Sequence, residues 1–274
     1  MKGDIVVIPE GAHSEVGPSS AERWINCGYS VLASRGVNAP PSDYALEGTA
    51  AHTVSEWVRK RGVPAQTFYG TTLRITHGTE HWDVYCGKPM VRGVQDFCDR
   101  VAQVPGYELV EARVDYTDAL FGPRWLWTGN EVPAFGTSDS IKLQDYVCDV
   151  SDFKFGKGVK KDAEMNEQLL LYAFGTYLGW RHLYDFDTFV LRIYQPRLNH
   201  YDRAEISLGR LIQWVGDVAA PAARRALQPN APIKAGGWCQ FCKVKPTCAV
   251  HSEYKQQREA VARQHDFAAL GDLD

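Results

Sequence analysis

The sequence contains no long apolar run and no recognisable signal peptide. None of its hydrophobic stretches approaches the ~20 residues that a membrane-spanning helix needs. The hydrophobic content of 45% and the charged content of 23% are typical of a soluble globular protein, and 274 residues suffice for a sizeable core. No repeat period or low-complexity block stands out. We therefore expect one elaborated domain or two small ones, with no membrane contact and a cytoplasmic location.

An excess of positive charge is missing as well. Lysine and arginine together number 30 against 33 acidic residues, so the formal net charge is −3. A nucleic-acid site would therefore be a local basic surface and not a property of the whole chain. The segment Gly156-Lys157-Gly158 lacks the second half of a P-loop, which excludes that nucleotide-binding motif. The lysines of this loop suit phosphate contacts, although a solvated loop explains them equally well: Lys157, Lys160 and Lys161.

The seven cysteines do not suggest a disulfide framework, because a cytosolic chain keeps its thiols reduced. Cys239, Cys242 and Cys248 have the spacing C-x2-C-x5-C, which indicates a metal site whose fourth ligand comes from elsewhere. Cys27 stands apart, at the end of a short helix stopped by Gly28. By spacing alone, four thiolates favour structural zinc slightly over an iron–sulfur cluster. The remaining cysteines lie in strand-like or helical patterns and are expected in the core: Cys86, Cys98 and Cys148.

Two predicted strands carry the residues with the clearest chemistry. An alternating pattern predicts the first strand over 140–143, directly after Asp139, and the second over 146–154. Asp152 and Lys154 lie two residues apart, so both side chains project from the same face of the second strand. A helix is predicted next, and it carries further polar residues.

These residues suit metal-assisted hydrolysis of a phosphodiester. Asp139 and Asp152 can hold a hard divalent cation through oxygen, and the carbonyl of Phe153 can complete its shell. Lys154 can orient or deprotonate water, or stabilise charge on the phosphate. The alternative is an ordinary hairpin with solvated charges, because Asp-x-Lys triplets are common by chance.

The ordered set Gly-Thr-Ser-Asp-Ser-Ile, Asp-Phe-Lys and Gln-x-x-x-Tyr resembles the RecB-like branch of the PD-(D/E)XK nucleases. The resemblance implies an α/β nuclease core, with a mixed sheet over about 108–194 flanked by helices over 90–104 and 162–180. It also implies Mg²⁺ or Mn²⁺ as cofactor. The residues that match catalytic positions of the family are Asp139, Asp152, Lys154, Gln168 and Tyr172.

The resemblance extends to the segment from Glu47 to His52, which opens a predicted helix through Lys60. Its Gly-Thr-x-x-His pattern implies that His52 is a metal ligand, although a lone helical histidine is more often structural. A neutral imidazole suits Mn²⁺ better than Mg²⁺. Glu47 precedes the predicted helix and ranks lower as an acidic contributor. Glu111 lies on a predicted strand, where such proteins often carry an acidic or polar residue that supports the metal site; an outward charge is the alternative.

One distant cysteine followed by C-x2-C-x5-C resembles the iron–sulfur staple of AddB-like and CRISPR-associated nucleases of the RecB family. The resemblance implies a [4Fe–4S] cluster, with Zn²⁺ as the alternative. Such a cluster would join an N-terminal helical part, residues 18–62, to a C-terminal segment, residues 234–250. Its ligands would be Cys27, Cys239, Cys242 and Cys248.

The resemblance covers about Pro18 to Cys248. Within the family, the chain is similar to stand-alone, phage-type members. The resemblance implies a single nuclease domain over 1–274 that acts as a DNA exonuclease in replication, recombination or end processing. A phage-encoded chain would work in the host cytoplasm, with DNA and either a single-strand-binding protein or a recombinase as partners. Two alternatives stay open: a DNA-binding recombination accessory protein with a structural zinc or iron–sulfur site, and a metalloenzyme or zinc-stabilised interaction protein unrelated to nucleic acid.

Overall fold

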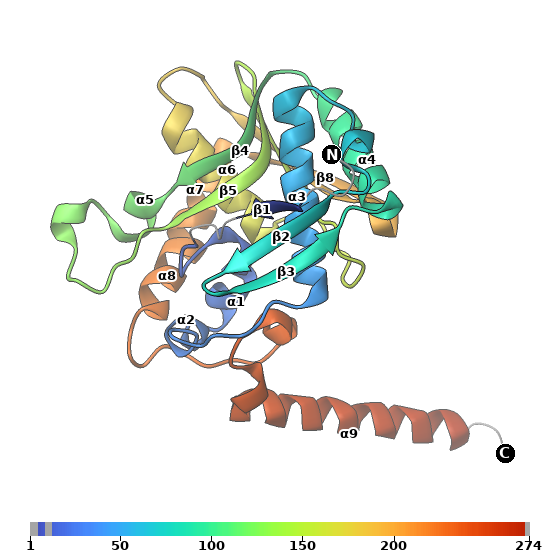
Figure 1. Cartoon of the computed structure of the whole chain (residues 1–274). Helices are drawn as coiled ribbons and strands as arrows, with labels where there is room; N and C mark the ends of the chain where they lie inside the picture. The colour runs from blue at the N-terminus through green and yellow to red at the C-terminus, as the bar shows by residue number, and fades with distance from the viewer. Residues whose placement is uncertain (1–4, 9–12, 272–274) are drawn as a thin grey trace.

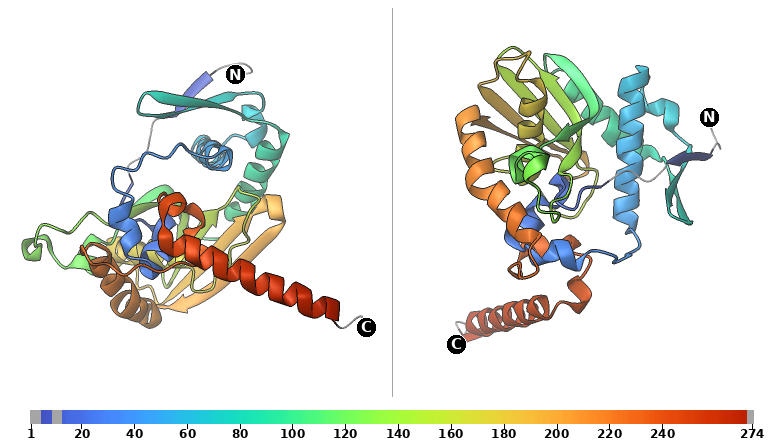
Figure 2. Two further views of the ribbon diagram at one scale, coloured as in Figure 1. Left: turned by 90° about the horizontal axis from the view of Figure 1, so that it is seen from below. Right: turned by 90° about the vertical axis from the view of Figure 1, so that its left-hand side faces the viewer.

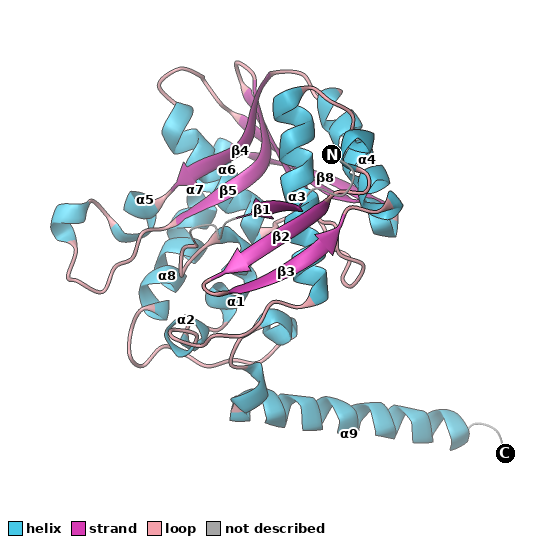
Figure 3. Cartoon of the chain, in the orientation of Figure 1, coloured by secondary structure: helices cyan, strands magenta, loops and turns pink. Residues whose placement is uncertain are grey.

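The computed structural model describes residues 5–8 and 13–271. The protein is a mixed α/β protein in which helices flank two mixed β-sheets (Figures 1 and 3). Within the described residues, no helix combines the length and apolar character required to cross a membrane.

The larger sheet has five strands in the order β4-β5-β6-β7-β8. Neighbouring strands are antiparallel, except that β6 and β7 are parallel and are connected through helix α6 (Glu167–Trp180). The predicted sheet is confirmed and continues one strand further along the chain. Its strands are β4 (Tyr107–Asp115), β5 (Phe135–Leu143), β6 (Val147–Phe153), β7 (Thr188–Gln195) and β8 (His200–Ser207).

Helices cover both faces of this sheet, and each face has its own hydrophobic core. Helix α6 packs on one face, over the first core, where its almost uninterrupted apolar run from Leu169 to Phe174 is buried. Helices α3 (Asp43–Arg61) and α4 (Lys88–Ala102) pack on the other face and share the second core with Phe153 of β6. The side chains of β6 therefore point alternately into two buried environments, which explains why nearly the whole strand is buried.

A three-stranded sheet lies beyond α3, on the side away from the larger sheet (Figure 2). β1 (Ile5–Ile8) runs parallel to β2 (Thr72–His77), which forms an antiparallel hairpin with β3 (Glu80–Tyr85). The sequence predicted the hairpin and an edge strand at β1. Leu73 and Ile75 bury the inner face of this sheet against α3 and α4.

A segment near the N-terminus and several later segments of the chain meet beside the core under α6. The N-terminal pieces are η1 (Pro18–Ser20), α1 (Ala21–Asn26) and α2 (Tyr29–Ala33). The later pieces are α5 (Thr117–Phe121), α7 (Leu208–Trp214), the π-helical turn η5 (Val215–Ala219), α8 (Ala220–Ala226), η6 (Gly237–Phe241) and η7 (Lys245–Thr247). Helix α9 (Ala249–Gly271) extends away from the rest of the protein (Figures 1 and 2). Short 3-10 turns complete the chain: η2 (Ala65–Phe68), η3 (Arg124–Leu126) and η4 (Pro196–Leu198).

Several predicted helix boundaries were wrong, each for a local reason. Helix α3 begins four residues early because Ser42 caps it by accepting from Ala45 N–H, so Glu47 lies inside the helix. Helix α6 begins late, at Glu167, because Asn166 is its capping residue. The helix predicted over 208–226 contains a π-helical turn just before Pro221, whose ring cannot continue the regular hydrogen bonding.

Candidate functional site

The candidate metal centre lies where two strands of the larger sheet separate. β5 and β6 pair from Leu143↔Cys148 to Ser140↔Ser151 and then diverge. Asp139 and Asp152 are the next residues on each strand, so their carboxylates lie at the opening. Phe153 N–H donates to Asp139 Oδ2 at 2.6 Å and bridges the gap. This amide fixes one carboxylate oxygen and leaves the other facing α3.

Helix α3 places His52 against that second oxygen. His52 Nδ1 lies 2.8 Å from Asp139 Oδ1, and its ring meets the edge of Phe153 with centroids 5.4 Å apart. Ala51 and Val54 bury the apolar stripe of the helix in the second core, which turns His52 toward the sheet. A third of the histidine side chain, 33%, stays accessible.

Glu111 joins these two residues through an unusual backbone conformation. Its φ of 52° is left-handed, a conformation that typically costs a non-glycine residue on the order of 1–3 kcal/mol. The β4–β5 ladder pairs Val110 and Ala112 with their partners but omits Glu111. Leu109 and Ala112 both pack on the first core, so the alternation of β4 shifts at this position.

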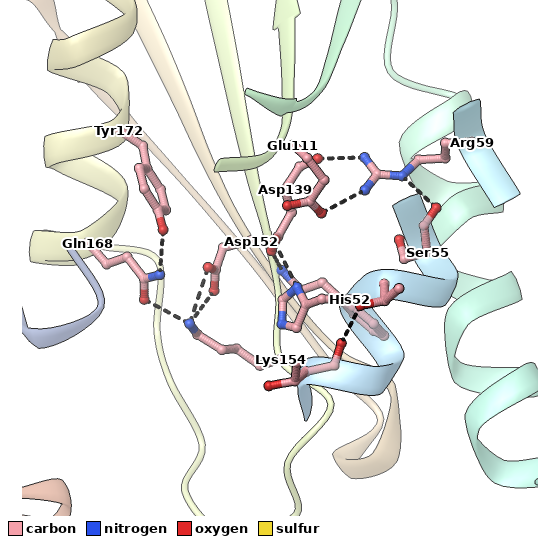
Figure 4. A network of polar contacts seen from close by, with 12 residues as sticks. His52, Ser55, Arg59, Glu111, Asp139, Asp152, Lys154, Gln168 and Tyr172 are labelled. Carbon is pink, nitrogen blue, oxygen red and sulfur yellow. Dashed lines mark hydrogen bonds and ion pairs between the residues drawn. The ribbon is translucent and has the colours of Figure 1, made fainter. Parts of the chain in front are cut away.

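The shift brings the Glu111 carboxylate to the histidine–aspartate pair. One ligand atom each of His52, Glu111 and Asp139 can be chosen so that all three lie within 4.8 Å of one another (Figure 4). The sequence analysis gave Glu111 a supporting role and gave Asp152 and the Phe153 carbonyl places in the shell. The geometry makes Glu111 a ligand candidate equal to the other two, while Asp152 and the Phe153 carbonyl remain predicted ligands.

Arg59 contacts the backbone of Asp139 and the carboxylate of Glu111, and it was not singled out from the sequence. Its guanidinium is 6% exposed and donates to the backbone oxygen of Asp139 at 2.6 Å. It also lies 3.2 Å from Glu108 and 3.5 Å from Glu111. Arg59 stands seven residues after His52, two helical turns along the same face, so this spacing was the available signal.

The other predicted catalytic residues form a chain of contacts across the opening (Figure 4). Lys154 Nζ lies 2.9 Å from Asp152 Oδ2 and donates to Gln168 Oε1 at 2.7 Å. Gln168 Nε2 donates to the Tyr172 hydroxyl at 3.1 Å. The structure therefore brings the Asp-x-Lys strand and the Gln-x-x-x-Tyr helix together as the motif order predicts.

Gly136 explains why this helix sits so close to the strand. A side chain there would approach Pro18 of η1 within 2.4 Å and Tyr172 within 2.9 Å. Only glycine lets β5, helix α6 and the N-terminal segment meet at this point.

The carboxylates at the centre have divergent proton affinities. Burial raises the pKa of Glu111 to about 8, and the neighbouring Asp139 charge adds to the effect. Burial also raises the pKa of Asp152, although Lys154 opposes the shift. Burial opposes ionisation of Asp139 too, but His52 and the Phe153 amide hold its pKa below the ordinary value. Burial works against the charged form of His52, yet Asp139 raises its pKa overall.

This donor set fits a divalent cation. One imidazole and two carboxylates converge, and a mixed nitrogen and oxygen shell suits Mn²⁺ better than Mg²⁺. Asp152 Oδ2 is buried and makes no hydrogen bond of acceptable geometry, although the Lys154 ammonium lies close to it. A bound cation would give that oxygen a partner.

The four predicted cluster cysteines line a single pocket between the α1–α2 region and the segment over 233–251. Cys27 caps α1, and Tyr29 N–H donates to Pro232 O at 3.2 Å. Arg23 donates to Phe241 O at 3.0 Å, which holds α1 against η6. His251, at the start of α9, lines the same pocket and was not considered from the sequence.

The thiols of this pocket do not stand as close together as the ligands of one bound zinc ion. No three sulfurs of the four described cysteines lie within 4.8 Å of one another. Four thiolates on one zinc ion at ~2.3 Å would stand about 3.8 Å apart. Burial raises the pKa of the Cys239 thiol, and the three other cysteines add to the shift. A metal or cluster would therefore have to displace its proton.

The sequence matches the family described as "Protein of unknown function (DUF2800)" over residues 13–272. The chain belongs to this family. The match spans both candidate sites, from Cys27 to Cys248. The description attaches no activity to the DUF2800 family, so the function has to be inferred from the two sites.

In this DUF2800 chain the predicted basic loop follows Lys154 and precedes α6. Lys157 and Lys160 are exposed, whereas Lys161 forms an ion pair with Glu22 of α1 at 2.7 Å. Gln195 holds the loop backbone by accepting from Lys161 N–H and donating to the Val159 oxygen, at 2.8 and 2.9 Å. The lysines thus project from a fixed backbone beside the candidate metal centre.

We expect the affinity of the candidate metal centre for Mn²⁺ to rise with pH up to about 8. Glu111 and His52 have raised pKa values, so both hold protons below those values, and the cation must displace them. Each displaced proton lowers the affinity roughly tenfold per pH unit below its pKa. Calorimetric titration with Mn²⁺ between about pH 6 and pH 9 measures this slope.

Glu111→Gln is the matched variant for that titration. Removing the titrating carboxyl should flatten the pH slope by about one proton while weakening binding at high pH. A wild-type affinity that does not change with pH would contradict Glu111 as a ligand.

Proposed function

We propose that this protein is a divalent-metal-dependent DNA exonuclease with a RecB-like PD-(D/E)XK core. One observation carries the proposal: His52, Glu111 and Asp139 converge beside the Asp152–Lys154 pair, at the point where two strands of a mixed sheet separate. An ordinary hairpin with solvated charges would leave these side chains apart and exposed. Here both aspartates are buried, at 6% and 3% exposure.

The arrangement of the sheet supports the nuclease core. Three antiparallel strands lead into α6, which returns the chain to a parallel fourth strand. Glu111 comes from the first of these strands and the two aspartates from the second and third. The lysine directly follows the third strand, and the glutamine and tyrosine come from α6. A histidine from α3 reaches the same place from the opposite face.

The reaction is hydrolysis of a phosphodiester. A water oxygen bonds to phosphorus, the bond from phosphorus to the leaving nucleotide oxygen breaks, and that oxygen takes up a proton. A bound divalent cation supplies charge stabilisation at the phosphate and lowers the pKa of its water. Asp152 and Gln168 hold the Lys154 ammonium where it can orient the attacking water or stabilise charge on the phosphate.

Gln168 and Tyr172 are assigned to positioning. Because Gln168 accepts from Lys154 with its oxygen and donates to Tyr172 with its nitrogen, its amide orientation is fixed at both ends. Burial raises the pKa of Tyr172 well above its ordinary value, so the hydroxyl keeps its proton. This contact chain reduces the freedom of the lysine before substrate arrives.

Exonuclease action is favoured over endonuclease action because the N-terminal segment packs directly beside the site. Pro18 lies against Gly136 and Tyr172, and Glu22 is paired with Lys161 of the basic loop. The exposed Lys157 and Lys160 can then hold the phosphates of a strand that enters by its end. Trp125 is 84% exposed at the tip of the 122–133 loop and is available for base stacking, whereas Trp127 packs against Phe121.

The cysteine pocket is assigned to a [4Fe–4S] cluster, with zinc as the alternative. All four thiols line one pocket, as a cluster whose four irons each take one cysteine requires. Its role is structural: Cys27 on α1 is joined to Cys239, Cys242 and Cys248 near the other end of the chain.

The decisive experiment compares linear and circular DNA. With Mn²⁺ or Mg²⁺, end-labelled linear DNA should be degraded, while covalently closed circles should stay intact at the same enzyme concentration. Removing the metal with a chelator should stop degradation. Rapid nicking of closed circles would overturn the exonuclease assignment and leave a metal-dependent nuclease. DNA binding with no cleavage under any metal would favour a recombination accessory protein.

A further inference from the structure

The ion pair between Glu47 and Arg197 stands next to the candidate active site and takes no part in the chemistry described above. Arg197 Nη1 donates to Glu47 Oε2 across the space between α3 and η4. Glu47 precedes His52 by five residues, or about 7.5 Å along the helix axis. Arg197 lies against Phe155, the residue after Lys154, with its guanidinium 4.7 Å from the ring centre. The pair therefore joins the helix that carries His52 to the segment that follows Lys154.

Arg197 belongs to the same segment that holds the basic loop. Gln195, two residues earlier, makes two hydrogen bonds to the backbone of that loop. Lys154 N–H also donates to the Tyr194 oxygen at 2.8 Å, so the end of β7 runs beside the catalytic lysine. The backbone of Arg197 is thus fixed relative to Lys154 and to the loop lysines.

The hydrogen bonding of this arginine is incomplete. The side chain is only 13% exposed, and its Nε is buried without an acceptor among the described residues. A guanidinium has a fork of donors that matches the oxygens of a phosphate. Glu47 is 42% exposed, so its carboxylate remains largely hydrated and can leave the arginine for water at little cost.

We propose that Arg197 binds a phosphate of the DNA strand next to the scissile one, and that Glu47 occupies this phosphate site in the free protein. Binding of DNA exchanges the Glu47 carboxylate for a phosphodiester oxygen. This inference rests on the proposed nuclease function and adds a substrate contact to it. Because Glu47 competes with the phosphate and repels it, the two partners of one ion pair act on DNA affinity in opposite directions.

The test measures binding of a fluorescein-labelled oligonucleotide by full-length protein without divalent cation. Arg197→Gln should weaken binding roughly tenfold, as expected for one charge-assisted contact. It should also reduce the slope of log affinity against log salt concentration by about the amount that one phosphate contact contributes. Glu47→Gln should tighten binding about threefold, because the competing carboxylate is gone. Arg197→Lys keeps the charge and should retain the salt slope while recovering part of the affinity.

Arg74→Gln and Asp83→Asn provide matched controls. These residues form an ion pair on the β2–β3 hairpin of the smaller sheet and carry the same charges. Both variants should bind DNA as the wild type does. Opposite shifts at Glu47 and Arg197, with no shift at the control pair, support the proposal.

Other outcomes overturn it in distinguishable ways. If the wild type binds and cleaves DNA but Arg197→Gln keeps its affinity and salt slope, Arg197 is not a phosphate ligand and the nuclease proposal stands. If both substitutions weaken binding together and lower the melting temperature, the pair only fastens α3 to η4. If the wild type does not bind DNA, the proposed function fails together with this inference.

Discussion

Replacing Asp139 with asparagine should abolish DNA cleavage and leave the protein folded. Asp139 lies at the centre of the candidate site: His52 contacts one of its carboxylate oxygens, and the Phe153 amide donates to the other. A cation at such a site contributes several kcal/mol to the transition state, so its loss should lower the cleavage rate by a factor on the order of 10³ or more. The change is isosteric, which confines the effect to charge and metal binding.

The fold should survive because asparagine can satisfy the same partners. Its carbonyl oxygen can accept from Phe153 N–H, and its amide can donate to a neutral His52. The guanidinium of Arg59 contacts the backbone oxygen of residue 139, which the substitution does not alter. We therefore expect a nearly unchanged melting temperature in metal-free buffer.

The measurement is single-turnover cleavage of end-labelled DNA with saturating Mn²⁺, accompanied by Mn²⁺ titration and thermal melting. Asp145→Asn is the control, because Asp145 is an exposed carboxylate in the turn between β5 and β6. That variant should cleave DNA at the wild-type rate. Undiminished cleavage by Asp139→Asn would remove the metal centre from the mechanism.

The sheet and its catalytic motifs were predictable because local pattern decides them. The alternation around Ile141 and Val150 identifies two strands that face a core, and the Asp-x-Lys spacing places Asp152 and Lys154 on one face. The helix with Gln168 and Tyr172 follows from the same reasoning. The structure brings these residues together, and their catalytic roles remain predictions.

The position of Glu111 could not be predicted because it depends on a backbone conformation that its residue type does not signal. A left-handed residue in a strand is normally marked by glycine or asparagine, and a glutamate gives no such mark. Regular alternation would send the side chain to one fixed face of β4. The packing of both Leu109 and Ala112 on the same core goes with the shift instead.

The contacts of Arg59 and Arg197 are hidden from the sequence for a different reason. Arg59 meets Glu108 across 49 residues, and Arg197 meets Glu47 across 150 residues. No local spacing relates such partners, since topology alone brings them together. The helix boundary matters as well: placing Glu47 ahead of α3, as the sequence suggested, would remove it from the face that meets η4.

The second large effect is expected from a substitution in the cysteine pocket, and it concerns the stability of the protein and not DNA cleavage. Cys27→Ala should remove the iron from the protein and lower its melting temperature by roughly 10 °C, because metal binding at a closed site is part of the folding free energy and at least ~3 kcal/mol of it is lost. The effect should be global, since α1 is fastened to η6 and to the segment around Pro232 at this pocket.

Cys148→Ala is the matched control, because Cys148 is equally a free thiol but lies fully buried in the first core. That variant loses only the burial of one sulfur, about 1 kcal/mol or roughly 2–4 °C, and should keep its full iron content. Iron and zinc analysis of anaerobically purified protein, with the visible absorbance and a thermal melt, distinguishes the Cys27→Ala variant from the Cys148→Ala control. Stoichiometric zinc without iron would establish the alternative metal, with the same dependence on Cys27. An iron content and melting temperature of Cys27→Ala equal to those of Cys148→Ala would show that Cys27 is a core residue and that α1 is held to the cysteine segment by packing alone.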